Sequence, residues 1–190
     1  MLIDEFLPIY DFDEKHETTI HAPAEKVYAA LNSFDFNESA IISWLFWLRG
    51  LTCKENRKAT AKALTLRDMT KFDFVLLGEK KDEEILFGLI GKFWSPRGDL
   101  QKVKPEEFSV FAKEGFAKAG WNFSLSEIGE AEIRLKTETR VQCLGKSCHE
   151  SFRFYWRFVK PFSGWIRRET LRLIKQKAEA EVDVVTTAAR

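Results

Sequence analysis

The chain has 190 residues, with 30 Lys and Arg against 29 Asp and Glu and a net charge of +1. This length favours one domain, and 45% hydrophobic with 31% charged residues excludes disordered and fibrous proteins. The near-neutral charge argues against a strong electrostatic attraction to nucleic acid or to acidic membranes, because both partners need a basic surface. The 17 Phe, 6 Trp and 3 Tyr are unusual, since aromatic side chains fill a large core or line a binding site.

The first predicted elements are a strand and two helices. Residues 14–22 alternate and carry β-branched side chains, and Pro23 ends this strand where a helix can begin. Apolar residues then follow at helical spacing, at Val27, Ala30, Leu31 and Phe34. Residues 38–49 predict a second helix that is apolar almost all round. Residues 51–63 are typical of a loop, and a short helical turn is expected at 64–70.

From residue 72 onward the apolar period changes to two, which predicts antiparallel strands. The predicted strands lie at 72–79, 84–94, 116–126 and 131–143. The second of them is apolar on both faces, and Gly88 and Gly91 inside it indicate a bend or bulge. Gly129 and Glu130 form the turn between the last two strands.

The last third of the chain predicts a long helix. Ser147 and Glu150 have the spacing of a capping box at its start. A stripe follows at Phe152, Tyr155, Trp156 and Val159. Pro161 is expected to kink or interrupt the helix. Beyond it the expected apolar arc is Phe162, Trp165, Ile166, Leu173 and Ile174, with Arg167 on the polar side and Leu171 as an exception. The tail from Ala178 is expected to fray.

The junction from Thr19 to Leu31, and the late strand Leu135 to Val141 before a long helix, resemble the START-like (SRPBCC, helix-grip) superfamily. Segments 88–94, 119–123 and 161–168 resemble an uncharacterised bacterial branch of it. The resemblance implies a single α+β domain over residues 1–190, with its core at about 10–177. It further implies a curved antiparallel sheet wrapped around the C-terminal helix and an apolar cavity between them. Members bind lipids, sterols or polyketides, and some are cyclases.

Strand parity sorts the side chains by face and predicts a ligand-binding wall. Its members are Phe74, Phe87, Phe93, Trp121, Phe123, Thr137, Thr139, Tyr155 and Trp156. An apolar wall with a few polar groups is typical of a ligand pocket, while an ordinary core has the same composition. Both interpretations stay open from the sequence.

His16 shares the parity of Thr18 and Ile20 and is expected to face inward, as the only titratable side chain that parity places there. A histidine titrates near neutral pH and suits a general acid or base, so His16 is the candidate catalytic residue, with a structural histidine as the alternative. Glu138 and Arg140 are assigned to the outer, wet face, where ion pairs are common and weak.

Trp44 and Trp47 belong to the apolar segment 38–49. That segment is interpreted as a lid over the cavity, a transient membrane contact, a homodimer contact or a packed helix, and these alternatives remain open.

The three cysteines, Cys53, Cys143 and Cys148, are an odd number in a chain that needs no disulfides. They favour reduced thiols in a cytoplasm, and the N-terminal residues show no secretory signal. Cys143, Cys148 and His149 match no standard zinc spacing, so neither a metal nor another cofactor is expected.

The expected function is binding of a hydrophobic small molecule or lipid between the sheet and the C-terminal helix, without catalysis. One alternative is an enzyme resembling polyketide cyclases and dehydratases that acts in the same cavity. Another is a partner-binding module that uses segment 38–49.

Overall fold

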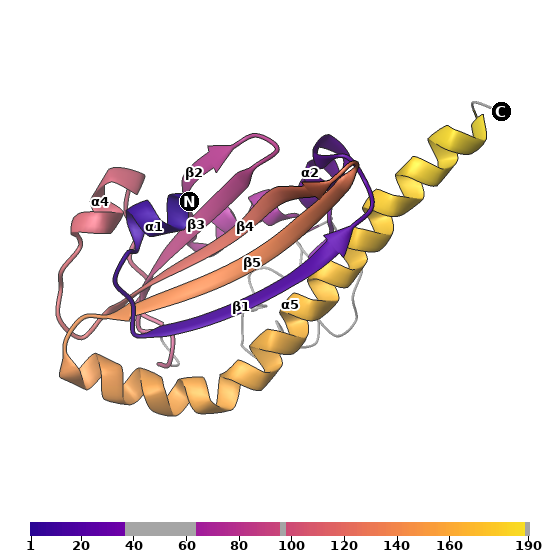
Figure 1. Ribbon diagram of the computed structural model, residues 1–190. Coiled ribbons are helices and arrows are strands. Elements are labelled where there is room, and N and C mark those ends of the chain that lie inside the picture. Colours follow the sequence, from indigo (N-terminus) through magenta and orange to yellow (C-terminus); the bar gives the residue numbers. More distant parts are fainter. Residues whose placement is uncertain (37–63, 96–97, 189–190) are drawn as a thin grey trace.

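The computed structural model describes residues 1–36, 64–95 and 98–188, with side chains described as far as residue 180. The elements shown in Figure 1 are α1 (Leu2–Phe6), β1 (Phe12–Ile20), α2 (Ala24–Asn32), the 3₁₀ helix η3 (Leu66–Phe72), β2 (Val75–Lys80), β3 (Glu84–Gly91), α4 (Pro105–Val110), β4 (Ala117–Gly129), β5 (Glu132–Cys143) and α5 (Lys146–Ala188). The chain is therefore α+β, with a long C-terminal helix along one face of an open antiparallel sheet, the helix-grip arrangement.

The five strands lie in the order β1-β5-β4-β3-β2. Strands β2 to β5 form a meander, whereas β1 pairs with β5 near the other end of the chain. Paired residues point to the same face, so one row of inner side chains crosses the whole sheet. From β2 to β1 this row is Leu76, Phe87, Trp121, Thr139 and Glu14. The row changes from apolar to charged as it approaches β1.

Helices α2 and α5 cover the inner face and enclose the main core. Its buried members include Val27, Leu31, Ile85, Phe87, Phe123, Leu135, Leu171, Ile174 and Ala178. Figure 1 shows α5 bending partway along its length as it follows the curved edge of the sheet beside β1. Pro161 lies inside the helix, lacks an N–H and crowds the preceding turn, which accounts for a bend. Of the two predicted effects of Pro161, the helix shows a kink and no interruption.

Helices α1 and α4 cover the outer face and enclose a second, smaller core. Its buried members are Leu2, Ile3, Leu7, Leu77, Leu86, Ile90, Phe108 and Phe116. Strand β3 serves both cores, which explains why its sequence is apolar on both faces. Neither short helix was predicted, because five or six residues are too few to show a helical period.

Glu138 and Arg140 lie on the outer face but are buried from solvent, since they are only 1% and 7% exposed. The prediction of an exposed ion pair was wrong because the N-terminal segment covers Arg140. Asp4 of α1 lies 2.7 Å from Arg140, and the Leu7 carbonyl accepts a bond from it. Arg140 Nε and Lys136 Nζ each lie 2.7 Å from a Glu138 oxygen. Asn122 connects this pair to Glu84, which also accepts the backbone N–H of Leu2.

Several predicted boundaries need correction. Strand β2 begins at Val75, since the preceding residues form η3 with a capping box between Thr65 and Asp68. Helix α5 begins at Lys146, which places Ser147 inside the first turn and removes the predicted cap. The helix continues to Ala188 and does not fray from Ala178, which is fully buried in the main core.

The buried face of α5 beyond Pro161 is also not the predicted arc. Phe162 and Trp165 are 46% and 45% exposed, whereas Leu171 is 2% exposed. The helix keeps its phase through the proline, so the face of Phe152 and Trp156 continues into smaller and more polar residues. Those residues are Ser163, Gly164, Arg167, Thr170 and Leu171.

Candidate functional site

A polar cluster lies on the inner face near the β1 edge of the sheet, between the sheet and α5. Its members are Glu14 and His16 from β1, Thr139 from β5, and Ser163 and Arg167 from α5, and we call them the inner polar cluster. Glu14 is directly paired with Thr139, and Thr139 is paired with Trp121 on β4. The cluster therefore continues the aromatic row of the sheet and borders the main core.

The charged members of the cluster contact one another. His16 Nε2 lies 3.0 Å from Glu14 Oε1. Arg167 Nε lies 3.7 Å from Glu14 Oε2 and 3.3 Å from Ser163 Oγ. The guanidinium carbon of Arg167 also stands 5.7 Å from the centre of the Trp121 ring. The arrangement places a histidine, a carboxylate and a guanidinium within one largely buried group.

Gly164 allows α5 to approach this cluster closely. A Cβ atom on Gly164 would lie 2.7 Å from Glu14 Oε1 and 3.3 Å from His16 Nε2. Carbon and oxygen atoms do not approach to 2.7 Å without a shift of one of them. The absence of a side chain therefore lets the helix backbone cover the Glu14–His16 pair directly.

Two buried oxygens of the cluster lack a hydrogen-bond partner among the described residues, namely Glu14 Oε2 and Thr139 Oγ1. The two residues are 7% and 8% exposed. A buried polar atom without a partner costs about 1–3 kcal/mol, so such atoms are rare in folded proteins. A ligand with an apolar body and a polar group could pack on the aromatic wall and form hydrogen bonds with these atoms.

The hydrogen-bond network around Glu138, on the outer face of the sheet, differs from the inner polar cluster in how fully its polar atoms are bonded. Within the described ranges, no buried side-chain atom of Glu84, Asn122, Glu138 or Arg140 is left without a partner. A fully bonded network of this kind holds α1 against the sheet. Among the described residues that are less than a tenth exposed, only Glu14 and Thr139 have a buried side-chain atom without a hydrogen-bond partner.

The predicted wall residues fall into two separate groups. Phe74, Phe87, Trp121 and Phe123 belong to or pack against the main core beside the inner polar cluster. The Trp121 ring lies 6.3 Å from that of Phe74 and 5.2 Å from that of Phe123. Thr137 is fully buried, accepts a bond from Trp121 Nε1 and donates one to the Asn122 carbonyl. Its hydroxyl is therefore already satisfied, unlike that of Thr139.

The other predicted wall residues, Phe93, Tyr155 and Trp156, pack around Phe152 at the beginning of α5. The Phe152 ring lies 5.7 Å from Tyr155 and 5.6 Å from Trp156. Tyr155 also lines an open groove of about 420 Å³. The groove residues are Trp94, Ser151, Phe154, Tyr155, Phe158 and Val159.

Sequence reasoning missed Glu14 and Arg167. Glu14 has the same strand parity as His16, but a charged residue was not expected to face the core. Arg167 was assigned to the outer side because the exposed aromatic residues Phe162 and Trp165 were taken as the buried arc. Continuing the phase of Phe152 along the helix would have placed Arg167 inward. Trp44 and Trp47, the predicted lid residues, lie outside the described residues.

No group of three His, Cys, Asp or Glu side chains in the described ranges is placed to bind a metal ion. Across the same ranges, no helix combines the length and apolar character that crossing a bilayer requires.

No known family model matches the chain, and no curated protein matches it. Among solved structures, it is similar to the crystal structure of TTHA0849 from Thermus thermophilus, with 10% identity and a TM-score of 0.34 over 90% of this chain and 99% of that one. It is also similar to the crystal structure of the Zhui aromatase/cyclase from Streptomyces sp. R1128, with 12% identity and a TM-score of 0.31 over 90% and 95%. The helix-grip description of this chain rests on its own sheet order and its own terminal helix.

Proposed function

We propose that the protein is a START-like (SRPBCC) protein of the cytoplasm that binds a hydrophobic small molecule or lipid between the sheet and α5, without chemistry of its own. The observation that carries this proposal is the pair of buried oxygens, Glu14 Oε2 and Thr139 Oγ1, that have no hydrogen-bond partner among the described residues and lie at the end of an aromatic wall. A ligand with an apolar body and one hydrogen-bonding group would contact the wall and satisfy these atoms. Cys143 and Cys148 are unlinked thiols, which agrees with a reducing compartment.

Native mass spectrometry of the freshly purified full chain tests the proposal first. We expect an additional organic mass on the protein, which solvent extraction releases. A protein that carries no extra mass and does not bind N-phenylnaphthylamine, an apolar dye with one N–H donor, would contradict ligand binding.

Two threonines two residues apart on β5 offer a matched pair of variants. Thr139→Val removes an unsatisfied hydroxyl, so we expect the free protein to become more stable by up to about 1 kcal/mol while it binds the extracted ligand or the dye about tenfold more weakly. Thr137→Val removes a hydroxyl with two partners, so we expect a loss of about 1–3 kcal/mol. Urea unfolding and dye titration of both variants measure these effects.

Equal destabilisation by the two variants, with unchanged dye binding, would show that Thr139 has a purely structural role. Opposite signs of the stability change, with weaker binding only for Thr139→Val, would support a binding site kept at the expense of stability.

A second candidate is an enzyme of the cyclase or dehydratase type, favoured by the 3.0 Å contact between His16 and Glu14. A carboxylate orients a histidine and supports its use as a general base. Tyr155 packs with Phe152 and lines the groove, so the hydroxyls in the cluster with His16 are those of Thr139 and Ser163.

The variant His16→Gln separates the two candidates. If the protein removes water from its ligand, the variant should carry a molecule heavier by the mass of one water than the native protein carries. If the protein only binds, the two extracted masses should be identical. Unchanged thermal stability of the variant would confirm that a mass difference reflects chemistry and not misfolding.

A further inference from the structure

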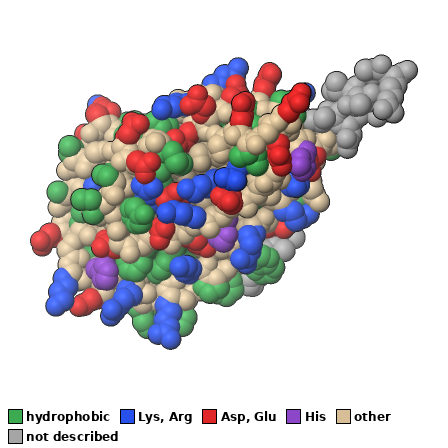
Figure 2. Space-filling model, in the orientation of Figure 1, with side chains coloured by type: hydrophobic (Ala, Val, Ile, Leu, Met, Phe, Trp, Pro, Cys, Tyr) green, Lys and Arg blue, Asp and Glu red, His purple; other side chains and the backbone are tan. Residues whose placement is uncertain are grey.

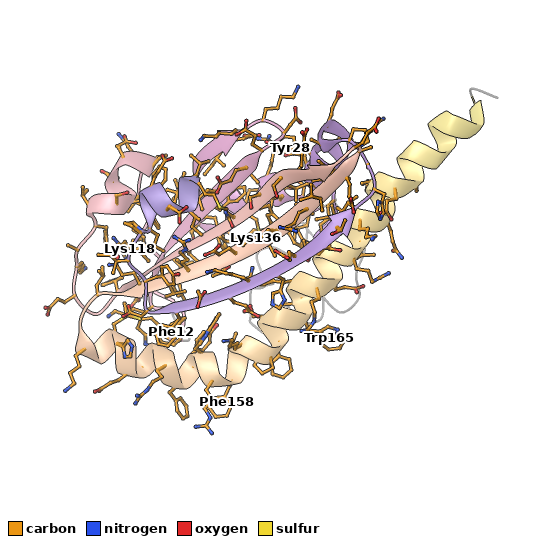
Figure 3. All side chains as sticks on the ribbon, in the orientation of Figure 1. Phe12, Tyr28, Lys118, Lys136, Phe158 and Trp165 are labelled. Carbon is orange, nitrogen blue, oxygen red and sulfur yellow. The ribbon has the colours of Figure 1, made fainter. Side chains whose placement is uncertain are left out.

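Four large aromatic side chains form a line on the outer side of α5. They are Phe154, Phe158, Phe162 and Trp165, and they are 69%, 58%, 46% and 45% exposed. We call this line the aromatic ridge. Figure 3 shows Phe158 and Trp165 projecting from α5 away from the sheet. Single exposed apolar residues are ordinary, but a continuous exposed row is typical of an interaction surface.

The ridge follows from the helical period. At 3.6 residues per turn, the four residues fall within an arc of about 80°. The rings of Phe154 and Phe158 are in contact, with centroids 5.1 Å apart. The opposite side of the helix is occupied by Phe152, Ser163 and Leu171, which are buried. No described element of the chain covers the outer side, because α5 forms the border of the molecule there (Figure 1).

Positive charge accompanies the ridge. Residues 146–168 contain six Lys and Arg and a single Glu, although the whole chain carries a net charge of only +1. Arg153, Arg157, Lys160 and Arg168 are all exposed. By the helical period these residues fall on one flank of the aromatic arc. Figure 2 shows hydrophobic and basic side chains side by side along the lower edge of the molecule.

We propose that the aromatic ridge and its basic flank dock α5 onto the surface of an anionic phospholipid bilayer. Trp and Phe side chains favour the interface between headgroups and acyl chains, and Lys and Arg beside them attract anionic headgroups. On the other flank, the groove of about 420 Å³ between Trp94 and the ridge adds further apolar surface at the same level. This docking is independent of what the inner polar cluster binds.

The charge also distinguishes a membrane from other occupants. In a symmetric dimer with antiparallel ridges, the basic flanks of the two copies would lie side by side and repel each other. Single-stranded nucleic acid binds in basic grooves where bases stack between aromatic residues. The ridge is convex and its charge lies on one flank, which suits a flat anionic surface better.

Flotation of the full chain with phosphatidylcholine vesicles, with and without phosphatidylglycerol, tests the proposal. We expect binding only to the vesicles that contain phosphatidylglycerol, and weaker binding as the salt concentration rises. Phe158→Gln and Trp165→Gln should each reduce binding about tenfold, because one large aromatic side chain then no longer leaves water. Val110→Gln is the matched control, since Val110 is 77% exposed on another helix and should have no effect.

Two double variants test the contribution of the basic flank to vesicle binding. Arg157→Gln with Lys160→Gln should weaken binding to anionic vesicles, whereas Lys81→Gln with Lys102→Gln, at exposed positions elsewhere, should not. Thr139→Val should bind vesicles like the native protein, so failure of ligand binding and failure of docking can be distinguished.

Three outcomes would overturn the proposal. The first is equal binding by native protein and both ridge variants, and the second is absence of binding to anionic vesicles. The third is a dimer, or a complex with a single-stranded oligonucleotide, that forms in place of vesicle binding and is lost in the ridge variants.

Discussion

At the scale of single residues, neighbouring positions on β5 show two uses of buried polar groups. Glu138 points outward and accepts bonds from Lys136 and Arg140. Thr139 points inward, and its hydroxyl has no hydrogen-bond partner among the described residues. A network in which every buried polar atom is hydrogen-bonded contributes rigidity. A buried hydroxyl without a partner can still form a hydrogen bond with another molecule. Side-chain alternation on one strand thus separates a structural site from a candidate binding site.

Glu138 gives a pH prediction. Burial opposes its ionisation, but hydrogen bonds from Lys136 and Arg140 outweigh burial and hold the pKa of Glu138 below its usual value of 4.5. A folded pKa below the unfolded one stabilises the protein above about pH 4.5, and this stability is lost as the pH falls through the folded pKa. Glu138→Gln should therefore cost about 3 kcal/mol at neutral pH and flatten the acid dependence of stability.

Urea unfolding at a series of pH values measures both effects. Glu130→Gln, at an exposed position in the turn between β4 and β5, should behave like the native protein. An acid profile of Glu138→Gln that runs parallel to the native profile would show that this carboxylate does not drive acid unfolding.

At the scale of elements, alternation and helical period predicted the five strands, α2 and the long α5. The short helices α1 and α4 could not be predicted, because one turn carries no period, and with them the second core was missed. Glu14 and Arg167 were missed for another reason. Apolar patterning assumes that charged residues face water, and that assumption fails at a buried polar cluster.

The close approach of α5 at Gly164 gives a prediction for this element. Glycine to alanine inside a helix usually stabilises a protein by about 1 kcal/mol. Here the new Cβ would displace Glu14 from His16, so we expect Gly164→Ala to lose about 1 kcal/mol instead. Ser151→Ala, exposed on the same helix, should change stability by less than about 0.5 kcal/mol. Chemical unfolding compares the two variants, and a gain in stability for Gly164→Ala would show that the helix has room to move.

At the scale of the whole molecule, one sheet supports a core on each face. Strand β3 contributes Ile85 and Phe87 to the inner core and Leu86 and Ile90 to the outer core. Loss of packing on one face therefore weakens the strand that the other face needs. Such sharing favours a single cooperative unfolding transition.

Phe108 tests this coupling from the outer core. It is fully buried, and its ring occupies the space above Gly88 on β3. Phe108→Ala should cost about 3–5 kcal/mol and keep one transition, whether unfolding is followed by tryptophan fluorescence or by circular dichroism. Val110→Ala, 77% exposed on the same helix, should be nearly neutral. Two separate transitions in Phe108→Ala would show that the cores are independent.

The pairing of β1 with β5 has a consequence for the order of folding. His16 and Thr137 are neighbours in the sheet, although about 120 residues separate them in the chain. The meander of β2 to β5 closes short loops and can assemble early, whereas β1 must wait until β5 has been synthesised. Of the five strands of the sheet, β1 is synthesised first and is thus among the last to pair. Glu14 and His16 lie on that strand, so the inner polar cluster is complete only after β5 and α5 have followed.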